Sequence, residues 1–286
     1  METATPGAKT TPDGWLNRLL EVLPGTHSAT EGISVGPTLP RILSGKVATT
    51  NFTLNQAATR RAPLDRPEVQ SAFDRLYIGN DTLSVAYREG QSARKAIMAQ
   101  LTEEMQIADR GAPSPVGFAG EAQKLGRLIA RDSTIKVAFV ALGGWDTHIN
   151  QGSSTGQLAN RLKGLGETVS ALAQGLGSAY SDTGIIVMSE FGRTAHENGN
   201  TGTDHGHGNV MWVAGGNVVG GKIYGQWPGI SGNELYEGRD LAITTDFRQV
   251  ISTVLEAQFG LTSTQLSKVI PNAPRANQEL SGLIRA

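Results

Sequence analysis

The sequence contains no cysteine, which excludes disulfide bonds, thiolate metal ligands and a cysteine nucleophile. It also lacks an excess of charge, because 25 basic residues balance 26 acidic ones. Nucleic acids and anionic membranes attract proteins through positive charge, so we expect neither as a partner. No apolar run approaches the ~20 residues that span a bilayer. Residues 1–14 are polar and show no export signal, and we expect a disordered leader there.

Helical periodicity alternates with short apolar runs along the rest of the chain. We expect helices over residues 15–22, 117–131 and 158–180, where leucine and other apolar residues recur every three to four positions. The nearly continuous apolar runs at 135–142 and 184–189 are typical of strands buried on both faces of a parallel sheet. A strand, a helix and a second strand of these lengths predict a right-handed crossover. Residues 15–286 therefore predict a single α/β domain, a mostly parallel sheet flanked by helices.

Other stretches have weaker patterns. Residues 24–67 show little periodicity and predict irregular extended chain, whereas residues 67–112 turn helical, with a long helix from about 83 to 111. Residues 209–214 and 218–224 predict two strands around a glycine-rich turn. A last helix is expected to begin with Thr245 as its N-cap and to stop at Gly260.

Polar side chains follow both predicted buried strands directly. Asp146 and His148 come after the first strand, and Glu190 and Arg193 come after the second. In open α/β sheets, ligands bind just beyond the carboxyl ends of the strands. We therefore expect the two loops to meet at one edge of the sheet.

These residues have the chemistry of a metal site. Asp146 and His148 are two positions apart, so an extended turn can point both to one side. Carboxylates and imidazoles together suit a divalent metal, zinc first, with manganese, iron or calcium as alternatives. Glycines at 202, 206 and 208 are expected to let the backbone approach a ligand closely. The expected metal ligands are Asp146, His148, Glu190, Asp204 and His205.

Three further residues are candidates for catalysis. His207 or His196 can act as a general acid, and Arg193 can stabilise negative charge on a substrate. The same residue types also have structural roles. Asp204 can orient a histidine or close a turn, His207 can support a metal ligand from outside, and Arg193 can form a structural ion pair.

Three motifs resemble one protein family. GGWDTH at 143–148, SEFGRT at 189–194 and GTDHGHGNVMWVAGGNVVGGKIYG at 202–225 occur in the order found in the DUF1501 family, and the similarity extends from residue 14 to residue 260. The resemblance implies a relationship to sulfatases within the alkaline phosphatase superfamily, with an alkaline-phosphatase-like core. It implies metal-dependent hydrolysis of phosphate or sulfate esters of small molecules. By position, Asp146, His148, Glu190 and His205 resemble the metal ligands of the superfamily.

The sequence departs from the pattern of the superfamily in two ways. Phe191 follows Glu190 where the superfamily has a histidine ligand, so we expect one metal rather than two. The family also carries an acidic ligand and a nucleophile on a strand that precedes Gly14, and we expect this chain to lack that N-terminal part. A metal-activated water would then replace the missing nucleophile. The family resemblance suggests an exported or periplasmic protein, although this chain shows no signal peptide.

Two other functions compete with this hypothesis. Gly152-Ser-Ser-Thr-Gly156 matches the GxSxG pattern of serine esterases, with Ser154 as nucleophile and His205 or His207 and an aspartate as partners. However, Ser154 lies twelve residues after Leu142, so it does not directly follow the predicted strand. The third hypothesis is a non-catalytic remnant of the hydrolase fold that binds a sugar or another partner.

Overall fold

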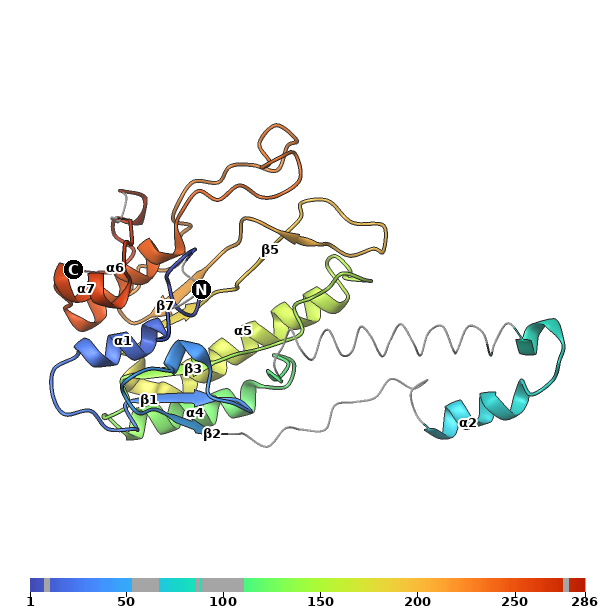
Figure 1. The fold of residues 1–286 in the computed structure, drawn as a ribbon, viewed down its shortest axis with the longest axis horizontal. Coiled ribbons are helices and arrows are strands. Elements are labelled where there is room, and N and C mark those ends of the chain that lie inside the picture. The colour runs from blue at the N-terminus through green and yellow to red at the C-terminus, as the bar shows by residue number, and fades with distance from the viewer. Residues whose placement is uncertain (8–10, 53–66, 86–87, 89–110, 275–277, 286) are drawn as a thin grey trace.

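The computed structural model describes residues 1–7, 11–52, 67–85, 88, 111–274 and 278–285 of the chain. The regular elements follow one another as shown in Figure 1: α1 (Trp15–Val22), β1 (Gly32–Val35), η1 (Arg41–Leu43), β2 (Thr50–Phe52), α2 (Pro67–Leu76), α4 (Ala119–Arg131), β3 (Val137–Val140), α5 (Gln157–Leu176), η3 (Gly177–Asp182), β4 (Gly184–Val187), β5 (Gly192–Arg193), β6 (His205–Gly206), β7 (Trp212–Gly215), α6 (Phe247–Phe259), α7 (Ser263–Val269) and η4 (Gln278–Leu280).

The largest sheet has three parallel strands in the order β2-β1-β3, which confirms the α/β class. The prediction of irregular chain over 24–67 is wrong, because this stretch supplies β1 and β2. β1 is the central strand of this sheet, and all four of its residues are buried. A strand of four residues is too short to show the alternation of apolar and polar residues that predicts a strand. Its neighbours along the chain are turn-forming residues, so the sequence did not indicate β1.

The predicted crossover between the two apolar runs is also wrong. Within the described ranges, β3 pairs with β1, whereas β4 pairs with β7 in a separate antiparallel sheet. β3 is therefore an edge strand, and Ala138 within it is exposed rather than buried on both faces. The hairpin predicted around Gly215 does not form, because β7 pairs with β4 and Val218 makes its bridge with Ile284.

The helices lie close to their predicted positions. α1 spans the predicted residues 15–22, α4 begins two residues later than expected, and α5 ends at Leu176 before a 3-10 turn. The cap of α6 is Asp246 rather than Thr245, because the Asp246 carboxylate accepts a hydrogen bond from the backbone N–H of Arg248. Gly260 ends this helix in the left-handed conformation, as predicted. The long helix expected from 83 to 111 lies mostly outside the described residues.

The first residues of the chain differ from the expected disordered leader. Ala4 is buried in the core, and the Glu2 carbonyl oxygen accepts a hydrogen bond from the backbone N–H of Trp15 at 3.0 Å. Arg18 on α1 donates to the carbonyl oxygens of Thr3 at 2.6 Å and of Val269 at 2.7 Å. These hydrogen bonds attach the start of the chain to α1 and to the end of α7.

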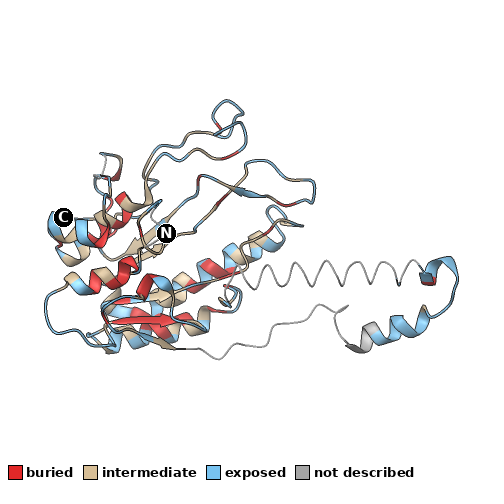
Figure 2. Ribbon diagram, in the orientation of Figure 1, coloured by how far each residue is buried: buried red, intermediate tan, exposed pale blue. Residues whose placement is uncertain are grey.

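The core is formed where helices cover the strands (Figure 2). One cluster joins α1, α6 and α7 to β3 through Leu19, Ile251, Val269 and Val137. A second cluster packs β1 against α4, with Val35 and Leu125 as members. No helix in the described ranges has both the length and the apolar character to cross a membrane.

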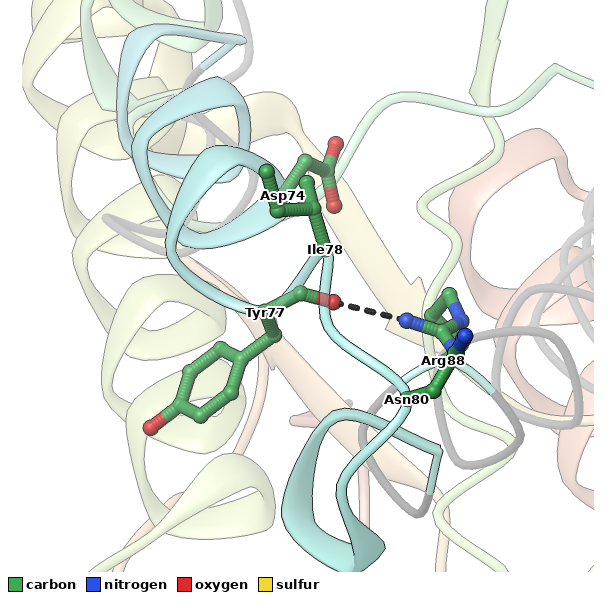
Figure 3. Close-up of a pocket in the computed structure, with 5 residues that line it drawn as sticks. All are labelled: Asp74, Tyr77, Ile78, Asn80 and Arg88. Atoms are coloured by element: carbon green, nitrogen blue, oxygen red, sulfur yellow. Dashed lines mark hydrogen bonds between the residues drawn. The ribbon is translucent and has the colours of Figure 1, made fainter.

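A pocket of about 360 Å³ lies beside the end of α2 (Figure 3). Arg88 donates hydrogen bonds there to the carbonyl oxygens of Tyr77 at 2.9 Å and Gly79 at 2.7 Å. Asp74, Ile78 and Asn80 complete the lining. None of the predicted site residues lines this pocket, so it does not locate the candidate site.

Helices α4 and α5 pack with their backbones in direct contact. A Cβ atom added at Gly126 of α4 would lie 2.5 Å from the carbonyl oxygen of Leu172, and one at Gly175 of α5 would lie 2.2 Å from that of Gln123. Only glycine allows this approach, since real Cβ atoms do not reach such distances. The helix pair thereby fixes α5, whose first turn contacts the loop that carries Asp146.

We predict that Gly175→Ala lowers the free energy of unfolding by about 1–3 kcal/mol, because the added methyl group forces the two backbones apart. Gly166→Ala is the matched control on the same helix. Gly166 is exposed and has open space around its Cβ position, so the better helix propensity of alanine should raise stability by about 1 kcal/mol. Urea unfolding of both variants measures these effects, and equal shifts would contradict the packing argument.

Candidate metal centre

The two loops that were expected to meet do meet, although their strands belong to different sheets. Asp146 and His148 lie in the loop that follows β3, with the buried Thr147 between them facing the interior. His205 lies on β6, which pairs antiparallel with β5, so that Arg193 stands opposite His205. The pairing of these two strands places His205 beside Asp146, although the two residues are 59 positions apart in the sequence.

Asp146, His148 and His205 form a compact group of potential metal ligands. One ligand atom from each lies within 4.8 Å of the other two. The Oδ1 atom of Asp146 is 2.5 Å from His205 Nε2 and 3.4 Å from His148 Nε2. The Asp146 side chain is 17% exposed, whereas those of His148 and His205 are 40% and 51% exposed. The group therefore has a shielded carboxylate and two imidazoles that open toward solvent.

Asp204 supports a histidine of this group. Its Oδ1 atom accepts a hydrogen bond from Nδ1 of His148 at 2.9 Å, on the opposite side of the ring from Asp146. Asn198 donates to the same Asp204 oxygen and to the carbonyl oxygen of His148, both at 3.0 Å. The bond from His148, followed by that from Asn198, holds the pKa of the Asp204 carboxyl below its usual range. An ionised carboxylate on the far nitrogen of a histidine fixes the tautomer and orientation that metal binding needs.

Arg193 lies against the loop of Asp146. It donates hydrogen bonds to the carbonyl oxygens of Trp145 and, at 2.6 Å, of Thr203. Its Nη2 atom lies 3.8 Å from Asp146 Oδ1. Burial lowers the pKa of the guanidinium, and Asp146 opposes that effect. Arg193 thus combines a structural function with a positive charge beside the carboxylate.

Phe191 contributes packing to this site. Its ring stacks on the ring of His205, with centroids 4.2 Å apart and planes at 6°. The guanidinium of Arg193 lies 5.1 Å from the centre of the same ring. Phe191 therefore holds His205 in position by contact, although it cannot bind a metal itself.

Glu190 and His196 are predicted site residues that do not belong to the three-residue ligand group. Glu190 is exposed and its carboxylate does not belong to the three-residue ligand group, so its role as a ligand stays a prediction. His196 is exposed as well, and its carbonyl oxygen accepts a hydrogen bond from Thr194. Its role as a general acid likewise stays a prediction.

His207 belongs to a second cluster next to the first. Its Nδ1 atom lies 2.6 Å from Oδ2 of Asp240, a fully buried carboxylate that also accepts a hydrogen bond from Arg239 at 2.9 Å. The His207 ring contacts Tyr236, with centroids 4.3 Å apart. Hydrogen bonds from Arg239 and then His207 lower the pKa of Asp240, against the effect of its desolvation. With Nδ1 engaged, Nε2 is the nitrogen through which His207 can exchange a proton with a substrate.

The glycines of this region allow two backbone segments to lie in direct contact. A Cβ atom at Gly202 would lie 2.3 Å from the carbonyl oxygen of His148, and one at Gly206 would lie 2.6 Å from that of Arg193. At Gly208 it would lie 2.6 Å from the carbonyl oxygen of Leu241. Neighbouring backbone fills the space beside these glycines, so they allow two segments of the chain to lie in contact, and their role in the approach to a ligand stays a prediction.

Asp240 and Asn198 are site residues that no sequence pattern indicated. Asp240 lies 33 residues after His207, and Asn198 lies 50 residues after His148, whose carbonyl oxygen it binds. Neither stands in a motif of its own, so only the folded chain shows these partners.

Ser154 is exposed in the bend that precedes α5 and lies well beyond the end of β3. This is not the tight strand-to-helix turn that a nucleophilic serine needs.

We predict that Asp204→Asn weakens zinc binding by about 10- to 100-fold, because His148 loses the charged partner that orients it. Glu197→Gln removes the same charge from an exposed position of the same loop and is the matched control. Competition with a chromophoric chelator measures both affinities. Equal affinities of the two variants would show that Asp204 does not support the site.

The lowered pKa of Asp240 predicts a stability that depends on pH. A carboxyl whose pKa is depressed by folding contributes stability that is complete above its unfolded pKa, about 3.9, and is lost as the pH falls through the lower folded value. The difference in unfolding free energy between the wild type and Asp240→Asn should therefore shrink as the pH falls below about 4. Urea unfolding above and below this pH tests it, and a difference that grows toward low pH would contradict it.

Comparison with known proteins places the chain in a family. A family model described as "Protein of unknown function (DUF1501)" matches residues 1–272. No curated protein and no solved structure matches the chain. The match covers both site loops and nearly the whole sequence. The chain is a member of the DUF1501 family.

Proposed function

We propose that this protein is a metal-dependent hydrolase of phosphate or sulfate esters, built on an alkaline-phosphatase-like core that is related to the sulfatases. The observation that carries the proposal is the group of Asp146, His148 and His205, whose ligand atoms lie within 4.8 Å of one another at the meeting point of two loops. The substrate would be a small molecule with an ester bond.

The residues fit a metal ion in number, type and spacing. Two ligands of one tetrahedral zinc ion, each about 2.0–2.1 Å from it, are separated by about 3.3 Å. His148 Nε2 and Asp146 Oδ1 have this separation, at 3.4 Å. His205 Nε2 and Asp146 Oδ1 are hydrogen-bonded at 2.5 Å, so they must move apart by less than ~1 Å as the cation takes the place of the shared proton. A nitrogen and oxygen set favours zinc, with manganese, iron or calcium as alternatives.

When bound, a divalent ion supplies Lewis acidity toward an ester oxygen and lowers the pKa of a coordinated water. The residues around the group complete the chemistry of hydrolysis. Arg193 carries a positive charge 3.8 Å from Asp146 and can hold an anionic oxygen of the ester. His207, oriented by Asp240, can donate a proton from Nε2 to the leaving oxygen. Phe191 shields one face of His205 from water.

The test is hydrolysis of p-nitrophenyl phosphate, sulfate and acetate by purified protein with measured zinc content. We expect turnover of the phosphate or the sulfate that EDTA abolishes and that zinc restores. His148→Ala should lose this activity together with the metal, and Ser154→Ala should keep it, because Ser154 lies outside the ligand group.

Two results would contradict the proposal. Acetate hydrolysis that resists EDTA and disappears in Ser154→Ala would identify a serine esterase. Stoichiometric zinc without turnover of any of the three esters would instead favour a non-catalytic binding protein.

A further inference from the structure

Arg161 lies close to the candidate site but was not among the residues that the sequence singled out. It lies in the second turn of α5, and the start of this helix is attached to the loop of Asp146. Gln157 donates hydrogen bonds to the carbonyl oxygens of Ile149 at 2.9 Å and Asn150 at 3.1 Å. The same Gln157 side chain accepts a hydrogen bond from Nη1 of Arg161 at 3.1 Å.

The guanidinium of Arg161 packs against the loop just before Asp146. A Cβ atom added at Gly144 would lie 2.9 Å from Nε of Arg161, and Gly144 has a φ of +89° that favours glycine. Arg193 donates to the carbonyl oxygen of the next residue, Trp145. The two guanidinium groups therefore contact successive residues of the loop that carries the shared carboxylate.

The two positive charges are close enough to repel one another, and this repulsion adds to the burial that lowers the pKa of Arg193. Asp146, at 3.8 Å from Arg193, and Asp204 compensate part of the charge. A divalent cation held by Asp146 would use up the compensation that Asp146 provides. Two guanidinium groups beside such a cation leave a local excess of positive charge, which an anion of high charge would neutralise.

We infer that Arg161 is a specificity-determining residue, which together with Arg193 makes the site prefer dianionic phosphate monoesters over monoanionic sulfate esters. This inference rests on the proposed function and narrows its substrate class. A phosphate monoester carries nearly two negative charges above its second pKa of about 6. A sulfate ester carries one charge, so it gains less from each guanidinium. Removing one guanidinium should therefore reduce the affinity for the dianion more than that for the monoanion.

The experiment compares Arg161→Gln with Lys163→Gln in the zinc-loaded protein at pH 8. Lys163 lies two residues further along α5, its ammonium is exposed, and Glu167 lies 3.9 Å away, so its removal controls for the loss of one positive charge. The probes are the binding of inorganic phosphate by calorimetry and the kcat/KM for p-nitrophenyl phosphate and p-nitrophenyl sulfate. Arg161→Lys keeps the positive charge, so this variant separates the effect of losing the charge from the effect of losing the contact of Arg161 with Gln157.

We expect Arg161→Gln to weaken phosphate binding and to lower kcat/KM for p-nitrophenyl phosphate by about 10- to 100-fold, through KM. The kcat/KM for p-nitrophenyl sulfate should fall at most about threefold, and Lys163→Gln should match the wild type. Arg161→Lys should recover part of the preference.

Equal effects on the two esters, or equal behaviour of Arg161→Gln and Lys163→Gln, would overturn the inference. Loss of phosphate binding specific to Arg161→Gln, in a protein that hydrolyses neither ester, would contradict the hydrolase proposal and still support anion binding by Arg161.

Discussion

The site depends on one carboxylate, Asp146, that three cationic or imidazole groups share. Its Oδ1 atom lies 2.5 Å from His205, 3.4 Å from His148 and 3.8 Å from Arg193. These partners come from the loop after β3 and from the paired strands β5 and β6. β3 belongs to one sheet, and β5 and β6 together form another. Because a poorly exposed carboxylate needs compensating partners, the shared aspartate explains why these two loops are held together.

The groups around Asp146 are themselves held in place by the fold. Asp204 binds the outer nitrogen of His148, Phe191 stacks on His205, and glycines at 202 and 206 let the backbones of the two loops touch. The donor atoms are therefore oriented by packing and hydrogen bonds, which is the property that a metal site of definite geometry requires. The same architecture leaves the histidine edges open to solvent, where a small ester could enter.

Sequence patterns predicted the parts that local chemistry determines. The helices followed from their periodicity, and the spacing of Asp146 and His148 correctly predicted a shared side, since Thr147 between them is buried. The strands were harder to predict from the sequence. β1 is only four residues long, and no local sequence pattern indicates that β4 pairs with β7 rather than with β3. The roles within the site likewise depend on tertiary contacts. Asp204 was expected as a ligand, and its carboxylate accepts a hydrogen bond from the far nitrogen of His148. Asp240 and Arg161 join the site through contacts that form only in the folded chain.

The central claim is that Asp146, His148 and His205 bind one metal ion. X-ray absorption at the zinc edge of the zinc-loaded protein tests it most directly, because imidazole ligands give a characteristic outer-shell signal. We expect one zinc per chain with two imidazole nitrogens and oxygen ligands at about 2.0–2.1 Å. We also expect His148→Ala and His205→Ala each to remove one imidazole. Zinc without imidazole ligands, or a spectrum that neither substitution changes, would contradict it.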